Sequence, residues 1–390
     1  MLEVADVLRQ HGAAYLDAHG AAVPRRHQRV IRDLIACRTA ELGGHLYECD
    51  CCGHRQYAYH SCRNRHCPKC HGKDMEAWLA QRRKELLPVP YFHVVFTLPE
   101  ALRRIVRGYP HLLYPILMRS AAESLQKLAA DPRYIGGQLG ILAVLHTWTR
   151  TLEYHPHVHC LIPGGGMRPD GTWAPARKDF LVPVRALSAI FRGKFMAKAK
   201  RMLPDQTWPG AVWKQDWVVY AKPTAQRPEV VLNYLGRYVH RVAIANSRLL
   251  SLDEGRVTFS YRRVRDLHKR TMKLSAHEFI RRFLQHVLPN GFHKVRYYGL
   301  WAPTNHKHLH RLREELATSD LAKEPDQTEQ PNHDELEKPH RPESTLCPLC
   351  QKGNLRWVSQ VPRSQIPLGA RAPPLWSTPI TSIMPSKVAT

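Results

Sequence analysis

Hydrophobic and polar positions alternate with a period of two in several short segments and with a helical period in longer ones. Such alternation, or a short apolar and β-rich run, predicts β-strands at residues 92–98, 141–148, 156–162, 213–221 and 258–261. The helical period predicts helices at residues 2–18, 25–38, 73–87, 184–203, 227–243 and 275–287, with two more within 99–131. Because strands and helices do not alternate as regular βαβ units, we expect an α+β protein in which helices cover a sheet.

Histidines occupy alternate positions of the predicted strand at 156–162. Successive side chains of a strand point to opposite faces, so His157 and His159 lie on one face and Val158 on the other. If this strand pairs with the preceding one as a hairpin, His146 becomes a third member of the group, unless it is a packing residue. Neutral imidazoles in this arrangement favour a divalent metal, whereas a packed or surface histidine pair is the simpler alternative.

Two tyrosines share one face of the predicted helix at 227–243. Tyr234 and Tyr238 are one helical turn apart. A phenol has a pKa near 10 and becomes a nucleophile beside a cation such as a bound metal, which also polarises a phosphate. A core aromatic stripe is the alternative interpretation, but Arg237 and Arg241 in the same segment suit phosphate contact. We predict that both tyrosines are catalytic and that Tyr234 acts first.

Seven of the ten cysteines fall between Cys37 and Cys70. C-x2-C pairs in a long chain without a secretion signal indicate metal binding rather than disulfides. Two such pairs are separated by fourteen residues, close to the spacing of a zinc ribbon. We therefore predict one structural Zn²⁺ held by four thiolates, Cys49, Cys52, Cys67 and Cys70.

Four further cysteines have other expected roles. Cys37 lies in a predicted helix and is expected in the core, and Cys62 is either a packing residue or a replacement ligand. The C-terminal pair Cys347–Cys350 has no second C-x2-C after it, so the favoured interpretation is an unoccupied knuckle. His333 and His340 are the alternative partners that would complete a site with it.

The charge of the chain indicates a polyanionic partner. There are 58 Lys and Arg against 33 Asp and Glu, which gives a formal net charge of +25. These side chains are spread over the chain rather than concentrated on one amphipathic helix, which favours nucleic acid over a membrane surface. No apolar run approaches the ~18 residues of a transmembrane helix, and residues 1–6 lack the features of a signal peptide. We expect no membrane partner and a cytoplasmic location.

Several motifs in one order resemble the HUH superfamily of single-strand DNA nucleases, named for histidine, an apolar residue and histidine. Within it, the chain resembles the two-tyrosine, rolling-circle transposases of the IS91 group of insertion sequences. The matching segments are residues 61–70, 90–99, 145–148, 155–166, 234–241 and 279–283, within a span from about residue 25 to about residue 315.

The resemblance implies a fold, a reaction and partners. The fold would be an antiparallel sheet with the metal site on one face, after an N-terminal zinc-binding module. The reaction would be nicking and rejoining of single-stranded DNA through a 5′-phosphotyrosine, with Mg²⁺ or Mn²⁺ held by His157, His159 and His146. The partners would be single-stranded DNA, hairpins at the ends of the element and host replication proteins, in the nucleoid of a bacterial cytoplasm.

The expected organisation follows from these motifs and from composition. The predicted parts are a helical module with a zinc ribbon at about 45–72 (1–88), a nuclease domain (89–316), a disordered linker (317–345), a C-terminal cysteine knuckle (346–358) and a disordered tail (359–390). Two other functions stay open. They are a replication initiator or relaxase of the HUH type, against which the N-terminal cysteine motif argues, and a catalytically inactive zinc DNA-binding protein.

Overall fold

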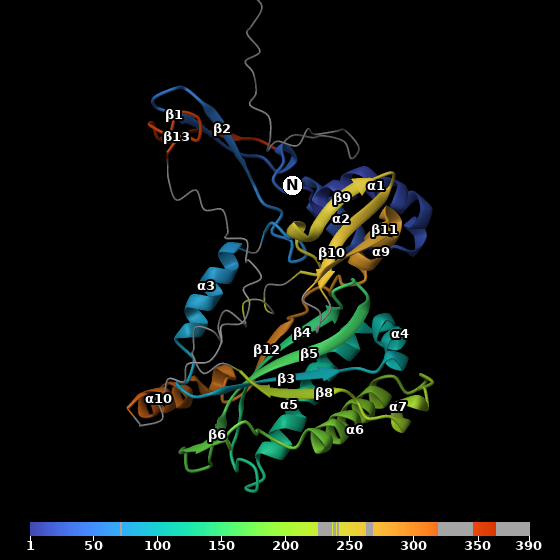
Figure 1. Ribbon diagram of the computed structural model, residues 1–390, viewed down its shortest axis with the longest axis vertical. Coiled ribbons are helices and arrows are strands. Elements are labelled where there is room, and N and C mark those ends of the chain that lie inside the picture. The colour runs from blue at the N-terminus through green and yellow to red at the C-terminus, as the bar shows by residue number, and fades with distance from the viewer. Residues whose placement is uncertain are drawn as a thin grey trace, which may run out of the picture.

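The computed structural model describes residues 1–70, 72–224, 236, 239, 242–262, 268–318 and 346–363 (Figure 1). The candidate nucleophiles Tyr234 and Tyr238 lie outside the described residues, as do Arg237 and Arg241. Most of the predicted linker and tail also lies outside them. In the part of the chain that is described, no helix is both long enough and apolar enough to span a membrane.

The largest sheet is antiparallel and has the strand order β12-β4-β5-β3-β8 within the described residues (Figure 1). Its strands are β3 (Tyr91–Thr97), β4 (Gly140–Trp148), β5 (Tyr154–Pro163), β8 (Val219–Pro223) and β12 (Val295–Gly299). The consecutive strands β4 and β5 pair directly, which is the hairpin that would bring His146 to the other two histidines. The α+β class with an antiparallel sheet is therefore confirmed.

Helices cover one face of this sheet. They are α4 (Glu100–Gly108), α5 (Pro110–Ala129) and α6 (Val184–Met202). The apolar side chains at alternate positions of the strands meet them, so that Val158 and Cys160 of β5 are buried with Leu117 of α5 and Phe191 of α6. Successive side chains of a strand point to opposite faces. The residues between Val158 and Cys160 and on either side of them therefore point away from the helices.

The opposite face of the sheet is covered only in part. Leu142, Val144 and Leu161 on this face share a second core with side chains of α3 (Gly72–Arg83) and α10 (His306–Ala317). The histidines lie on this face, further along β4 and β5, where the register continues from Val144 to His146.

The N-terminal helices pack with segments from far along the chain. α1 (Val4–His19) and α2 (Arg25–Ala36) share a core with α9 (Ala276–Leu284) and with the antiparallel sheet β11-β10-β9. The strands of that sheet are β9 (Leu249–Asp253), β10 (Arg256–Arg262) and β11 (Lys269–Ser275). The first 36 residues therefore share their core with residues that lie beyond the predicted domain boundary at residue 88.

A third sheet joins the two ends of the described chain. It has the order β13-β1-β2, with β1 (Gly44–Cys49), β2 (Arg55–Tyr59) and β13 (Leu355–Val361). Figure 1 shows it projecting from the rest of the molecule. The predicted disordered tail is wrong for its first residues. Residues 359–361 belong to β13 and pair with β1.

The remaining elements are short. They are β6 (Gly165–Met167), β7 (Trp173–Pro175), α7 (Ala211–Lys214), and the 3-10 helices η1 (Gly20–Ala22), η2 (Ala40–Leu42), η3 (Asn246–Arg248) and η4 (Pro303–Asn305). α7 occupies the start of the segment predicted as a strand at 213–221, and the strand itself begins at Val219.

Candidate metal centre

Three histidines meet on the partly covered face of the large sheet. His146 of β4 lies directly opposite His157 of β5, and His159 follows two positions later on the same face. One ring nitrogen from each lies within 4.8 Å of the others. His146 is 3% exposed, and the other two are half-buried. The structure thus brings together the three residues that the sequence predicts as metal ligands.

The backbone beside His157 selects the tautomer that a metal requires. Nδ1 of His157 lies 2.6 Å from the carbonyl oxygen of His155, and because a carbonyl only accepts, Nδ1 carries the hydrogen. The lone pair that can bind a metal is then on Nε2. Burial lowers the pKa of His157 from its usual value to about 4, so the ring is neutral near pH 7 and does not repel a cation.

His93 supports the group from the neighbouring strand β3, a role that the sequence did not reveal. Its Nε2 lies 2.8 Å from Nδ1 of His159, and burial lowers its pKa to about 4. When Nδ1 of His159 donates this bond, Nε2 of His159 carries the lone pair that can bind a metal. His93 is therefore a positioning residue for His159. Its only sequence signal is its place on the same face as Tyr91 and Val95 in an alternating strand.

Removal of this support is expected to weaken metal binding. His93→Ala should lower the Mn²⁺ affinity of the centre by about 10- to 100-fold, because ligands whose outer hydrogen bond is lost are no longer held in one orientation. Titration calorimetry or Mn²⁺ spin resonance would measure the affinity. His308→Ala, an exposed histidine of α10, is the matched control and should bind as the wild type does. An unchanged affinity in His93→Ala would remove His93 from the centre.

Aromatic and buried polar groups enclose the centre from one side. The indole of Trp148 stacks on His146, with ring centroids 4.6 Å apart. Behind it, His286 is bonded to the Thr147 hydroxyl at 3.2 Å and to the carbonyl oxygen of Leu152 at 3.1 Å. Burial lowers the pKa of His286 to about 3, so it stays neutral. This packing holds the ring of His146 in place from one side.

A cation lies beside the centre. Arg103 of α4 donates from Nη2 to Nδ1 of His155 at 2.8 Å, and His155 shares the face of His157 with ring centroids 5.2 Å apart. Burial and the Arg103 charge lower the pKa of His155. A guanidinium bonded to the histidine beside His157 suits contact with an anion bound at the centre, such as a phosphate.

Residues next to the candidate tyrosines are among those described. Gly236 and Val239 are helical and buried. Val239 belongs to the same core as Leu142, Val144 and Leu161, which lie on the histidine face of the sheet. A Cβ added to Gly236 would meet Leu79 of α3 at 3.4 Å. These two described residues therefore pack against the core on this face of the sheet.

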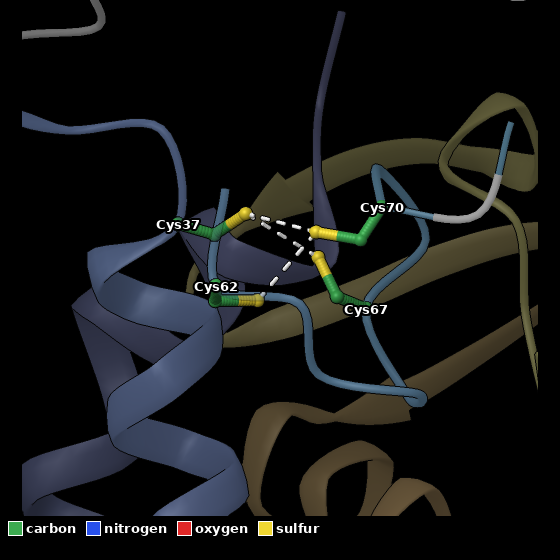
Figure 2. A group of neighbouring side chains, drawn as sticks. All are labelled: Cys37, Cys62, Cys67 and Cys70. Atoms are coloured by element: carbon green, nitrogen blue, oxygen red, sulfur yellow. Dashed lines mark hydrogen bonds between the residues drawn. The ribbon is translucent and has the colours of Figure 1, made fainter. Parts of the chain in front are cut away.

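Four cysteines of the N-terminal module form one compact group, shown in Figure 2. Its members are Cys37, Cys62, Cys67 and Cys70. Sulfur–sulfur distances are 3.5 Å from Cys37 to Cys70 and 3.6 Å from Cys62 to Cys70. Tetrahedral zinc with Zn–S bonds of about 2.3 Å needs sulfurs about 3.8 Å apart, whereas a disulfide needs about 2.05 Å. The group has the spacing of a zinc site.

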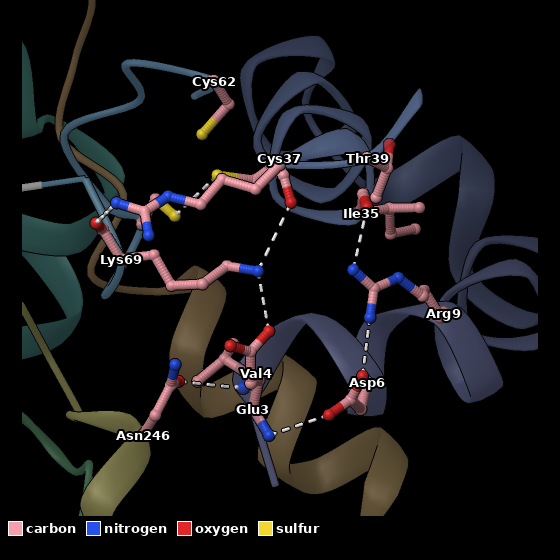
Figure 3. Close-up of polar contacts among 12 residues, drawn as sticks. Glu3, Val4, Asp6, Arg9, Ile35, Cys37, Thr39, Cys62, Lys69 and Asn246 are labelled. Atoms are coloured by element: carbon pink, nitrogen blue, oxygen red, sulfur yellow. Dashed lines mark hydrogen bonds and ion pairs between the residues drawn. The ribbon is translucent and has the colours of Figure 1, made fainter. Parts of the chain in front are cut away.

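Polar contacts connect this group to both N-terminal helices (Figure 3). The Lys69 ammonium donates to the carbonyl oxygen of Cys37 at 3.3 Å and forms an ion pair of 2.7 Å with Glu3. The amide of Val4 donates to the side-chain oxygen of Asn246 at 3.1 Å. The cysteine loop, the end of α2 and the start of α1 are thus held together.

The predicted ligand set is wrong in its grouping. Cys49 and Cys52 do not join Cys67 and Cys70, but lie with Cys347 and Cys350 in a separate group. Cys37, expected in the core, and Cys62 take the two other places beside Cys67 and Cys70. The reason is the path of the chain, because β1 and β2 carry residues 44–59 out as a hairpin, and the amide of Arg38 meets the carbonyl of His60 at 3.1 Å. The two C-terminal cysteines, expected to form an unoccupied knuckle, are members of a complete four-sulfur group.

Loss of one sulfur from the first group should release its metal. Cys67→Ser is expected to lose one equivalent of zinc per chain and to lower the melting temperature by on the order of 10 °C, because metal binding there is coupled to folding. Elemental analysis and thermal unfolding would show both effects. Cys51→Ser, an exposed cysteine outside this group, should retain the wild-type zinc content and melting temperature. Full zinc content in Cys67→Ser would contradict the assignment.

Comparison with known proteins gives consistent matches to transposases. The Y2 transposase family model, described as "Putative transposase", matches residues 140–336, and a model described as "Transposase zinc-binding domain" of the IS91 type matches residues 7–98. The chain is 42% identical over 374 residues to "Putative transposase y4qJ" of Sinorhizobium fredii, which covers 90% of this chain and 94% of that protein.

Two further matches were found. The chain is 30% identical over 293 residues to the transposase for insertion sequence element IS801 of Pseudomonas savastanoi pv. phaseolicola, covering 70% of this chain and 69% of that protein. Among solved structures, the conjugative relaxase TrwC in complex with oriT DNA aligns with a TM-score of 0.25 and 14% identity, over 58% of this chain and 71% of that one.

Proposed function

The chain belongs to the IS91 group of two-tyrosine transposases, and from this we propose that it cuts and rejoins single-stranded DNA through a 5′-phosphotyrosine formed beside its histidine centre. The observation that carries the proposal is the convergence of His146, His157 and His159 on the sheet face that also holds Val239. Val239 directly follows Tyr238 in the chain.

The donor set fits a divalent metal. Three imidazoles within 4.8 Å of one another, with an outer hydrogen bond from His157 to a carbonyl and another between His159 and His93, are the arrangement that binds such ions. Of the two expected metals, Mn²⁺ suits nitrogen ligands better than Mg²⁺. Held by these three rings, the ion would supply Lewis-acid polarisation of the scissile phosphate.

The tyrosines supply the covalent chemistry. The phenolic oxygen of Tyr234 forms a bond to phosphorus as the bond from phosphorus to the 3′-oxygen breaks. The phenol gives up its proton and the departing 3′-oxygen takes up a proton, which leaves a 3′-hydroxyl. A second 3′-hydroxyl reverses the step and rejoins the strand, so no nucleotide cofactor is needed. Tyr238 allows a second cleavage in the same complex. Arg103 beside the centre would contact the phosphate and stabilise its charge.

The wider substrate and location follow from the same proposal. The formal charge of +25 suits a protein that binds DNA through many phosphate contacts. The substrates would be single-stranded DNA and hairpins at the ends of the insertion sequence, handled together with host replication proteins in the bacterial nucleoid. Rolling-circle transposition of the element is the biological outcome that this chemistry serves.

The two alternatives are less well supported. A catalytically inactive DNA-binding protein would be favoured if the histidine pair faced the helix-covered core, but Val158 and Cys160 occupy that side of β5. A replication initiator or relaxase uses related chemistry, but both of the relatives described above are named as transposases.

A strand-cleavage assay tests the proposal. Single-stranded oligonucleotides from the two ends of the element are incubated with the protein and Mn²⁺, Mg²⁺ or a chelator. We expect cleavage at a defined position with either ion, stronger with Mn²⁺, and none with the chelator. Cleavage that is unaffected by chelation, or an equal rate on duplex DNA, would contradict the proposal.

A further inference from the structure

The small sheet β13-β1-β2 lacks the apolar core that usually stabilises a sheet. No residue of these three strands belongs to any hydrophobic core cluster formed by the described residues. Several of its large side chains face solvent, since Trp357 is 61% exposed, Val358 44% and Tyr57 43%. A few strands without a buried face are marginally stable in water. Another interaction must therefore hold residues 346–363 against the N-terminal hairpin.

Four sulfur atoms meet at the end of this sheet. They come from two C-x2-C knuckles that lie about 300 residues apart in the chain, Cys49–Cys52 and Cys347–Cys350. The Cys49 and Cys350 sulfurs are 3.7 Å apart, and those of Cys52 and Cys347 are 3.6 Å apart. These distances match the edges of a tetrahedral Zn–S4 site, at about 3.8 Å, and exclude disulfides in this conformation.

In each C-x2-C pair, a backbone amide donates a hydrogen bond to a cysteine sulfur, as in metal-binding knuckles. The amide of Cys51 donates to the Cys49 sulfur and that of Gly353 to the Cys350 sulfur, both at 3.4 Å. Such bonds stabilise thiolates, the form that binds metal. A Cβ at Gly353 would lie 2.6 Å from the Cys49 sulfur and 2.5 Å from the Cys51 Cβ, so the close approach of the knuckles requires glycine there.

A carboxylate aligns the two segments. Asp50 accepts a hydrogen bond from the amide of Asn354 at 2.8 Å and from Nε of Arg356 at 3.1 Å, and its own amide donates to the Asn354 carbonyl at 3.1 Å. These contacts set the register of β13 on β1. They are exposed, and exposed ion pairs of this kind contribute little stability.

We propose that Cys49, Cys52, Cys347 and Cys350 bind a second structural Zn²⁺, which closes a zinc ribbon split between the two ends of the described chain. The N-terminal half supplies one knuckle and the strands β1 and β2, and the C-terminal half supplies the other knuckle and β13. Only the N-terminal half lies within residues 7–98, which the zinc-binding family model covers. The ion fastens residues 346–363 to the N-terminal module, and this role is independent of DNA cleavage.

Zinc stoichiometry tests the site directly. Elemental analysis of the purified full-length chain should give two zinc ions per chain and no iron. Cys49→Ser and Cys347→Ser should each contain one, and the double variant should still contain one, because both cysteines serve the same ion. Cys51→Ser, next to the site in sequence but outside the group of four, should contain two. A single zinc in the wild type that Cys347→Ser retains, iron in place of zinc, or two zinc ions in Cys347→Ser would overturn the proposal.

Hydrogen exchange tests the fastening. In the wild type, peptides from residues 346–363 should exchange slowly, because the amides of Cys347 and Asn354 donate to Gly353 and Asp50. In Cys49→Ser these C-terminal peptides should exchange faster by on the order of tenfold or more, although the substituted residue lies at the other end of the chain. Peptides from β4 and β5 should be unchanged, which distinguishes local release from unfolding. An unchanged exchange rate of residues 346–363 in Cys49→Ser would show that the zinc does not hold this segment to the N-terminal module.

Discussion

The double variant Tyr234→Phe, Tyr238→Phe is expected to form no covalent adduct with single-stranded DNA, whereas each single variant retains adduct formation. Each substitution removes one oxygen and keeps the ring, so packing is preserved and only the nucleophile is lost. If the two phenols act in succession, both single variants should fail in transposition in cells. Denaturing gels of protein incubated with labelled oligonucleotide measure the adduct, and a mating-out or plasmid assay measures transposition.

Tyr220 provides the matched control for this experiment. It is 51% exposed on β8, opposite Val95, which in turn lies opposite His159, so it shares the histidine face of the sheet. Tyr220→Phe should form adduct at the wild-type level. If only one of the two tyrosines forms the covalent link, its single variant should form as little adduct as the double variant. An adduct that persists in the double variant would contradict the assignment and direct attention to Tyr220.

His157→Ala and His159→Ala are expected to reduce cleavage by on the order of 10²- to 10³-fold or more and to leave DNA affinity within a factor of about three. Cleavage depends on charge stabilisation at one phosphate, which the metal held by these rings supplies. Affinity depends on contacts with many phosphates, spread over a chain with 58 Lys and Arg. Rates on a labelled oligonucleotide and binding by fluorescence anisotropy at fixed salt would measure the two quantities.

His308→Ala serves as the control here as well, since it removes an exposed imidazole from α10. It should leave both the rate and the affinity unchanged. Equal losses of affinity and of cleavage in His157→Ala and His159→Ala would indicate a structural site rather than a catalytic one.

Local patterns predicted the grouping of the three histidines because all three come from one hairpin. The alternation in residues 154–163 determines that His157 and His159 share a face, and the pairing of consecutive strands brings His146 opposite His157. His93 escaped assignment because it reaches the group through the pairing of β3 with β5, which are more than 50 residues apart. Nothing in the sequence around His93 specifies which strand becomes its neighbour.

The cysteine groups show even more clearly that the sequence does not reveal contacts between segments far apart in the chain. Sequence spacing indicated metal binding and a zinc ribbon, but it assigned ligands by proximity along the chain. In the structure, the hairpin of β1 and β2 separates Cys49 and Cys52 from Cys67 and Cys70, and each pair finds its partners elsewhere. Cys37 was expected in the core because it lies in a predicted helix, and it is indeed buried in the core that α1 and α2 share, where its sulfur also meets other sulfurs. Which cysteines lie together thus depends on contacts between distant segments, and the spacing of the cysteines along the chain does not determine these contacts.

The most direct test of the central claim is to identify the residue that becomes linked to DNA. The protein is incubated with Mn²⁺ and a single-stranded oligonucleotide from an element end, digested with protease and nuclease, and analysed by mass spectrometry. The account predicts a nucleotide joined through its 5′-phosphate to a peptide that contains Tyr234 or Tyr238. A link to any other residue, or cleavage that leaves only free 5′-phosphate ends, would contradict it.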